Sequence, residues 1–225
     1  MDGCRAGWLR VERPPSGQLE AVVVSTDQLF ATASEFAVLT IDIPIGLPER
    51  GPRSVDVSAR RLLGPRASSV FPCPVRAALD GTSYSDACAR SFTASGKKLS
   101  KQAFAILPKI REIDRVLRTS EECRARVREV HPEICFYYLN SLKPMAHSKK
   151  SKEGALERRE LLEAHFGPVF DRLRATVPTR DVASDDILDA LVALWSAERV
   201  LSGTNVVLPE VPECDRFGLR MEMVA

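Results

Sequence analysis

The run Ala37–Ile43 (AVLTIDI) restricts the possible folds of this chain more than any other stretch. It is short and almost continuously apolar, which is typical of a strand buried on both faces. Such strands occur mainly in α/β proteins, whose helices cover both faces of a largely parallel sheet. Pro44 and Gly46 follow at once and end the strand. The run therefore predicts an α/β fold with a buried central strand.

The stretches on either side of this run predict a mixed sheet. Two strands at 8–12 and 19–24 flank the turn signal Pro14–Gly17, which indicates an antiparallel hairpin. Another strand is expected at 126–131, bounded by Pro132. Helical spacing marks 26–36, 54–63, 99–117 (which Pro108 should bend or divide), 153–166 and 185–201. This order predicts one domain over residues 1–225 with a basic helical insertion at about 50–120.

The composition is that of an ordinary globular protein, with 44% hydrophobic and 28% charged residues. No apolar run approaches the roughly 18 residues that span a membrane. The chain shows no basic segment followed by an apolar one, so no signal peptide is expected. The six cysteines lack ligand spacing, which predicts reduced thiols and no zinc. We therefore expect a cytoplasmic protein without a membrane partner.

The charge is unevenly distributed along the chain. Residues 50–118 contain 14 Lys and Arg against 5 Asp and Glu, although the whole chain carries a net charge of only +2. A basic segment in a chain with an acidic centre suits a polyanionic partner such as nucleic acid. A solvated surface with scattered arginines explains the segment equally well.

Three carboxylates stand at the head of the last apolar helix. Asp185 and Asp186 lie four and three residues before Asp189, so all three share one side of a helix, where like charges repel by roughly 0.2–0.5 kcal/mol per pair. The helix dipole favours acids in a first turn. Asp189, however, is followed by the apolar run Ala190–Leu194 and is expected to be buried. The cluster therefore predicts a cation between the carboxylates.

Other acidic residues stand at predicted strand ends. Asp42 lies among apolar residues at the carboxyl end of the central strand, where α/β proteins gather their sites. An isolated carboxylate there would protonate unless it were paired or bound to metal. Asp2 precedes two glycines and carries little weight alone. Glu133 is an intermediate candidate beside His131, which is a candidate proton carrier or ligand, although a lone histidine is more often simply hydrogen-bonded.

The carboxylates of Asp42, Asp186 and Asp189 are hard oxygen ligands. Such ligands favour Mg²⁺ or Mn²⁺ over zinc. Two of these ions about 3.5–4 Å apart activate water and stabilise the leaving oxygen in phosphodiester hydrolysis. The sequence contains neither a serine-elbow motif nor a P-loop. The expected cofactor is therefore Mg²⁺ or Mn²⁺, bound as two ions.

Several stretches together match a known family. The main ones are Asp2–Trp8, Ile41–Leu47, Glu129–Glu133 and Asp185–Leu191, and the lesser ones are Arg53 with Asp56, Ser69–Phe71, Lys101–Lys109, and Lys149 and Lys150 with Gly154. Through them the chain, from its first residue to about Gly203, resembles the uncharacterised family labelled predicted RNase H-like nucleases. The resemblance implies a ribonuclease H-like mixed β-sheet flanked by helices, with acids on the first strand, a central strand and the final helix around divalent metal.

The resemblance also assigns roles to residues. It implies that Asp2, Asp42, Asp186 and Asp189 are catalytic metal ligands. Glu133 is a further catalytic candidate, and His131, Lys149, Lys150 and Asp185 are auxiliary candidates. One departure concerns the first strand, which in the family has apolar residues before its aspartate. Here Met1 directly precedes Asp2, which predicts weak anchoring of Asp2.

The expected function is phosphodiester hydrolysis by a metal-dependent nuclease. Its nucleic-acid backbone would be held by Arg53, Arg60, Lys97, Lys98, Lys101 and Lys109. One alternative is a non-catalytic nucleic-acid-binding or scaffold protein that retains the fold. Another, less favoured, is an actin-like phosphotransferase, which shares a first-strand Asp-Gly but requires two such domains and a glycine-rich adenosine-binding segment.

Overall fold

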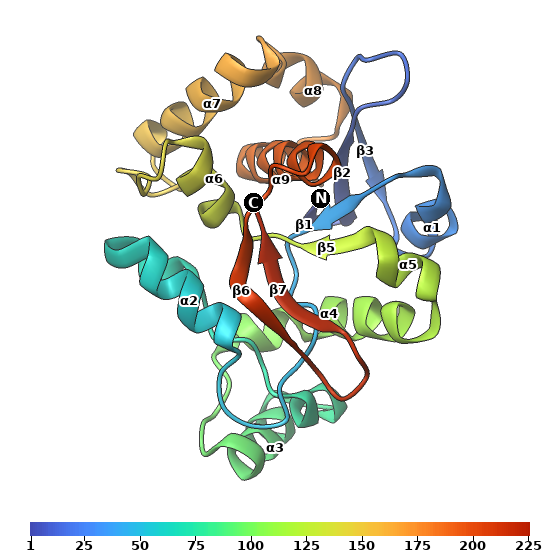
Figure 1. Cartoon of the computed structure of the whole chain (residues 1–225), viewed down its shortest axis with the longest axis vertical. Coiled ribbons are helices and arrows are strands. Elements are labelled where there is room, and N and C mark those ends of the chain that lie inside the picture. Colours follow the sequence, from blue (N-terminus) through green and yellow to red (C-terminus); the bar gives the residue numbers. More distant parts are fainter. The chain divides into compact units, whose positions relative to one another are not determined.

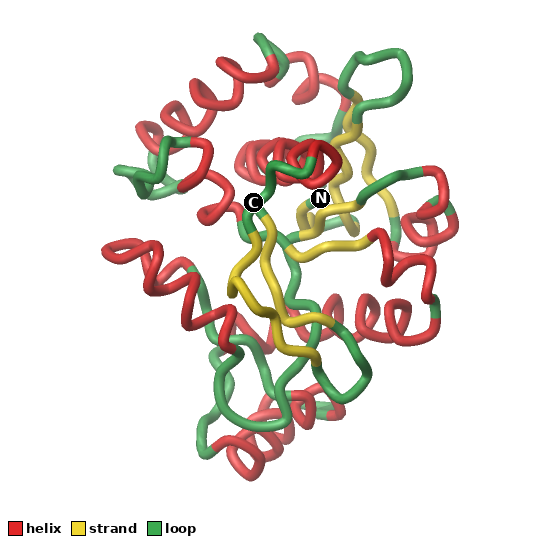
Figure 2. Tube along the Cα trace, viewed as in Figure 1, coloured by secondary structure: helices red, strands yellow, loops and turns green.

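The computed structural model describes residues 1–225 and contains two compact units (Figure 1). The first unit consists of Met1–Asp42, Arg126–Val206 and Val224–Ala225, and the second of Ile43–Ala125 and Val207–Met223. Both combine helices with strands, which confirms the α/β class (Figure 2). The insertion predicted at about 50–120 lies inside the second unit.

The first unit begins with a three-stranded antiparallel sheet. Its strands are β1 (Asp2–Cys4), β2 (Gly7–Glu12) and β3 (Glu20–Val24), and β2 pairs with both neighbours. Trp8 lies opposite Val24 and Glu12 opposite Glu20, so the predicted hairpin is confirmed. A side chain at Gly7 would meet the Val24 carbonyl oxygen at 2.5 Å, and its φ is +143°, so only glycine fits this close approach.

The strands β4 (Leu39–Ile41) and β5 (Val127–Glu129) form a parallel pair, with Leu39 opposite Val127. Met1 links this pair to the antiparallel sheet. Its amine donates to the Thr40 carbonyl oxygen at 2.7 Å, and its own carbonyl oxygen accepts from the Asp42 N–H at 3.0 Å. Met1 therefore bonds to the residues just before and just after Ile41, which is the hydrogen-bond pattern of parallel strands. The strands therefore follow the spatial order β3-β2-β1-β4-β5.

Helix α9 (Ser184–Ser202) packs on β1, β2 and β4 in this unit. Every residue from Ile187 to Ala197 is buried, because the helices α6 (Pro132–Leu139), α7 (Lys152–Phe166) and α8 (Phe170–Thr176) also pack against it (Figure 1). A helix that is apolar on nearly all sides is expected in such a position. Gly203 ends α9 in the left-handed conformation, as its sequence position predicted.

The helix expected at 26–36 is shorter than predicted. Helix α1 (Thr26–Ala31) starts at a capping box between Ser25 and Gln28, and a short 3₁₀ helix, Ala33–Glu35, follows it. Thr32 separates the two, and its hydroxyl donates to the Gln28 carbonyl oxygen at 3.2 Å. This local bond competes with the regular helical pattern, which accounts for the break.

The second unit consists of helices and one strand hairpin. Its elements are α2 (Ser54–Leu63), the 3₁₀ helices Gly64–Ser69 and Arg76–Asp80, α3 (Tyr84–Ser95), α4 (Lys101–Thr119), α5 (Glu121–Arg126), β6 (Val207–Cys214) and β7 (Arg220–Val224). Helix α4 continues through Pro108 as one element, so the predicted division does not occur. The hairpin β6–β7 was not predicted.

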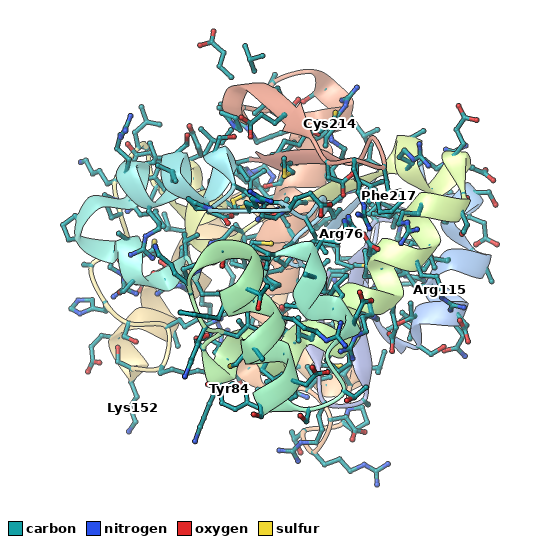
Figure 3. The ribbon with its side chains drawn as sticks, turned by 90° about the horizontal axis from the view of Figure 1, so that it is seen from below. Arg76, Tyr84, Arg115, Lys152, Cys214 and Phe217 are labelled. Carbon is teal, nitrogen blue, oxygen red and sulfur yellow. The ribbon has the colours of Figure 1, made fainter.

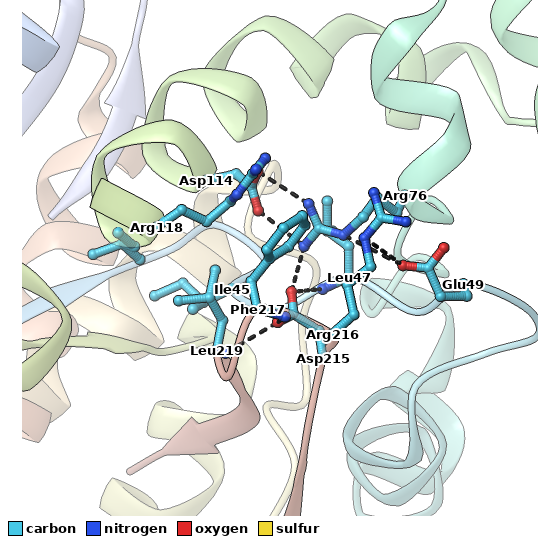
Figure 4. Close-up of polar contacts among 12 residues, drawn as sticks. Ile45, Leu47, Glu49, Arg76, Asp114, Arg118, Asp215, Arg216, Phe217 and Leu219 are labelled. Carbon is cyan, nitrogen blue, oxygen red and sulfur yellow. Dashed lines mark hydrogen bonds and ion pairs between the residues drawn. The ribbon is translucent and has the colours of Figure 1, made fainter. Parts of the chain in front are cut away.

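Arg76 occupies the interior of the second unit (Figures 3 and 4). Its guanidinium pairs with Asp114 of α4 and with Asp215 in the turn between β6 and β7. It also lies 4.6 Å from the centre of the Phe217 ring. Asp215 in turn accepts the backbone N–H groups of Leu47 and Leu219. A buried charge is stable only when it is paired and hydrogen-bonded, and this network satisfies that condition.

None of the helices is both long and apolar enough to cross a lipid bilayer.

Candidate functional site

Two neighbouring strands of the first unit bring Asp2 and Asp42 together. Asp2 lies in β1 opposite Leu9, and its side chain is almost fully buried. Asp42 directly follows β4, and its N–H donates to the carbonyl oxygen of Met1, the residue before Asp2. Asp2 is thus anchored by strand pairing on one side and by β4 on the other. The prediction that it would be weakly anchored is wrong.

Helix α9 supplies the third carboxylate. Asp189 is 1% exposed and lies in the second turn of a helix that packs on β1 and β4. Its Oδ2 accepts from the Lys149 ammonium at 2.5 Å. Its Oδ1 is buried and has no hydrogen-bond partner. A buried carboxylate oxygen without a partner is costly in free energy, which makes this oxygen a candidate ligand.

Burial and mutual repulsion shift the pKa values of these three carboxylates upward. Burial, followed by the charges of Asp189 and Asp42, raises the pKa of Asp2 well above its usual value. Burial also raises the pKa of Asp42, and the charges of His131 and Lys149 oppose this effect. Burial raises the pKa of Asp189 to about 6 even though Lys149 lowers it. Carboxylates crowded in this way are stabilised by a cation.

Lys149 is the cation that the cluster already contains. It comes from the segment between α6 and α7, and its side chain is partly buried. Burial alone would lower its pKa, but the Asp189 carboxylate, and after it those of Asp2 and Asp42, reverse this effect and raise the pKa. Lys149 therefore remains charged. The sequence placed it only among the auxiliary candidates.

The other two acids lie in the first turn of α9 and have partners of their own. Asp186 accepts the Ala183 N–H at 2.8 Å, so it caps the helix. Burial raises the pKa of Asp186, and its charge acts on Asp2 from the edge of the cluster. Asp185, an auxiliary candidate from the sequence, pairs with the exposed Lys150.

Glu133 lies outside the aspartate cluster. It is buried in the first turn of α6, and its Oε1 accepts from the guanidinium of Arg158 in α7. This ion pair gives Glu133 a partner inside the protein. His131 is the N-cap residue of α6, and its Nδ1 is buried without a hydrogen-bond partner. Its charge lowers the pKa of Asp42, so it lies within electrostatic reach of the cluster.

Arg158 was not among the sequence candidates, although the sequence contained a signal for it. Gly154, Arg158 and Leu162 are four residues apart and all buried, so they form the inner face of α7. An arginine on the apolar face of a helix must find a partner inside the protein. The charged composition of the helix masked this position.

The basic candidates all lie in the second unit. Arg53 is 1% exposed, pairs with Asp56 and donates to the Ile45 carbonyl oxygen, so it is a structural residue and its assignment to nucleic-acid binding is corrected. Arg60 donates to the Val70 carbonyl oxygen but remains exposed. Lys97, Lys98 and Lys101 are exposed, and Lys109 is partly buried.

The residues present fit a divalent cation. The cluster offers the hard carboxylate oxygens that Mg²⁺ and Mn²⁺ prefer, and the orphaned Oδ1 of Asp189 is one of them. No three of the His, Cys, Asp and Glu side chains are already arranged around a common point as ligands. With Lys149 on Oδ2 of Asp189, the side chains are arranged for an ammonium. A metal ion on Oδ1 would therefore compete with Lys149 for the negative charge of the Asp189 carboxylate.

Comparison with known proteins gives one match. A family model with the description "Protein of unknown function (DUF429)" matches residues 1–214. No curated protein and no solved structure matches the chain.

Proposed function

We propose that this chain, which belongs to the DUF429 family, is a divalent-metal-dependent nuclease with a ribonuclease H-like fold. The observation that carries the proposal is the orphaned Oδ1 of Asp189, buried where the carboxylates of Asp2 and Asp42 also act. An oxygen of this kind has no structural use, whereas it suits a metal ligand.

The topology of the first unit supports the fold assignment. The strand order is β3-β2-β1-β4-β5, with β2 antiparallel to β1 and with β4 parallel to β5. The acids lie on the first strand, directly after the central strand β4, and on α9. These are the positions that the family resemblance implied from the sequence.

Asp2, Asp42 and Asp189 would hold the metal, and Asp186 lies at the edge of their cluster. A bound divalent ion lowers the pKa of water and stabilises charge on phosphate oxygens. His131 favours the ionised form of Asp42, which is the form that binds a cation. Lys149, once released from Asp189, supplies a positive charge for the phosphate group. Lys97, Lys98 and Lys101 offer exposed charges for a nucleic-acid backbone.

The test is cleavage of DNA, RNA, hybrid and branched substrates in a Mg²⁺ and Mn²⁺ titration. Asp189→Asn and Asp42→Asn should each lower the rate more than about 100-fold, because even outer-shell partners of a metal contribute 10- to 100-fold. Asp171→Asn is the matched control, since Asp171 is an exposed acid paired with Arg159. Its rate should equal that of the unaltered protein. Cleavage that persists in Asp189→Asn contradicts the proposal.

The contact of Lys149 with Asp189 favours a second candidate function. Its ammonium already compensates the cluster, as a structural counter-ion would. A non-catalytic nucleic-acid-binding or scaffold protein would need nothing more. Such a protein would bind nucleic acid with a strong salt dependence but would cleave none of the substrates at any metal concentration.

A further inference from the structure

We propose that Glu133, Arg158 and Gly154 form a clamp that positions Lys149 on the aspartate cluster. The importance of this clamp for catalysis rests on the proposed function, but its physical action on Lys149 does not. The clamp gives Glu133 the role of a positioning residue acting through Lys149, in place of the predicted direct role in catalysis.

The segment that carries Lys149 has no regular structure of its own. It runs from Asn140 to Ser151, between α6 and α7. Ser141 and Leu142 at its start have φ values of 53° and 63°, in the left-handed region that non-glycine residues rarely adopt. Neither helix nor sheet pairing fixes this backbone. Contacts from the neighbouring helices must therefore determine where Lys149 points.

Arg158 supplies the first of these contacts. Its guanidinium is buried and donates to the carbonyl oxygen of His147 at 3.2 Å and to that of Gly154 at 2.9 Å. It also pairs with Glu133 of α6. The planar fork of an arginine can hold several acceptors in fixed directions. One side chain thus joins α6, α7 and the backbone two residues before Lys149.

Gly154 supplies the second contact. A Cβ atom at this position would lie 2.0 Å from the Ser148 carbonyl oxygen, which is a backbone atom. The segment therefore rests directly on α7, one residue before Lys149, and only glycine permits this approach. Glu157 of the same helix accepts the N–H groups of Ala146 and His147 at 2.8 and 3.2 Å. The three successive residues before Lys149 are thus all held by α7.

Together these contacts fix the position of the Lys149 ammonium group. Lys149 Nζ lies 2.5 Å from Oδ2 of Asp189, and its charge also acts on Asp2 and Asp42. A lysine side chain loses rotamer entropy when it is fixed, so its backbone must be held for the contact to persist. The clamp keeps the three carboxylates compensated before metal arrives, and it sets how strongly Lys149 competes with metal for Asp189.

The first readout is the NMR signal of the Lys149 NH₃⁺ group in metal-free, full-length protein, assigned with Lys149→Met. A paired, buried ammonium exchanges its protons slowly and gives a sharp signal. Gly154→Ala should weaken or shift it, because the added methyl group displaces the segment while alanine favours the helix. Glu133→Gln should do the same by releasing Arg158. Arg159→Met is the matched control, since Arg159 is the next residue of α7 and pairs with Asp171.

The second readout is Mn²⁺ affinity measured by calorimetry. Lys149→Met should bind Mn²⁺ at least about fivefold more tightly, since a competing cation is removed. Gly154→Ala should change affinity in the same direction, and the double variant should bind no more tightly than Lys149→Met alone. A folded Gly154→Ala with an unchanged Lys149 signal overturns the clamp. Absence of Mn²⁺ binding and of cleavage in the unaltered protein overturns the proposed function, whereas the NMR comparison still decides the clamp.

Discussion

At the scale of single residues, Asp189 makes the stability of the protein depend on pH. Burial raises its pKa from the usual 3.8 to about 6 in spite of Lys149. A carboxyl group with a raised pKa in the folded state stabilises the fold below pH 3.8, and this contribution is lost as the pH rises through about 6. The change corresponds to about 3 kcal/mol. The free energy of unfolding should therefore fall between pH 4 and 7 in the absence of metal.

This fall can be measured by urea unfolding at a series of pH values. Asp189→Asn should flatten the pH dependence, because an amide does not titrate. Burial also raises the pKa of Asp2, so the titration of Asp2 should preserve part of the pH dependence of stability. The control variant Asp171→Asn should retain the full slope. A slope that is unchanged in Asp189→Asn contradicts the assigned environment of this residue.

The residues of the site were only partly predictable from the sequence. Asp42 and Asp189 stood out because their neighbours are apolar, and the structure brings both to Asp2. The contact of Lys149 with Asp189 could not be predicted, since 40 residues separate them and an irregular segment carries the lysine. The ion pair of Glu133 could not be predicted either, because its partner Arg158 lies on another helix. Tertiary contacts, and not local spacing, decide these roles.

At the scale of the elements, Arg76 joins three pieces of the second unit: its own 3₁₀ helix, helix α4 through Asp114, and the β6–β7 turn through Asp215 (Figure 4).

Arg76→Met should lower the free energy of unfolding by about 3–5 kcal/mol, because it leaves two buried carboxylates without their cation. Arg216→Met is the matched control. Arg216 pairs with Glu49 at the surface, and its loss should change stability by less than about 1 kcal/mol. Urea unfolding of both variants provides the measurement, and equal losses would contradict the buried network.

Proline explains two of the elements that the sequence did not predict, α6 and β6. Pro132 was interpreted as the end of a strand, but it is the first residue of α6, where its missing N–H leaves no helical bond unmade. Pro209 and Pro212 interrupt the apolar pattern of β6, so this strand gave no clear signal. The elements without such interruptions, α2, α7, α9 and the β2–β3 hairpin, were predicted nearly residue for residue.

For the whole molecule, metal binding should appear as a gain in stability. A ligand that binds only the folded state at 100 times its dissociation constant stabilises that state by about 2.7 kcal/mol. Mn²⁺ should therefore raise the melting temperature of the full chain, whereas Asp189→Asn should show little change. Sodium chloride at the same ionic strength controls for general charge screening. Equal shifts in the unaltered protein and in Asp189→Asn would place the metal elsewhere.

The parallel pairing of β4 with β5 has a consequence for biosynthesis. Residues 42–126 lie between the two strands, so at 5–20 residues per second β5 leaves the ribosome roughly 4–17 s after β4. Throughout that interval the apolar edge of β4 has no β5 to cover it. Lys149 and Asp189 are made later still. A nascent chain that carries only Asp2 and Asp42 therefore has no complete acidic cluster until α9 has been made.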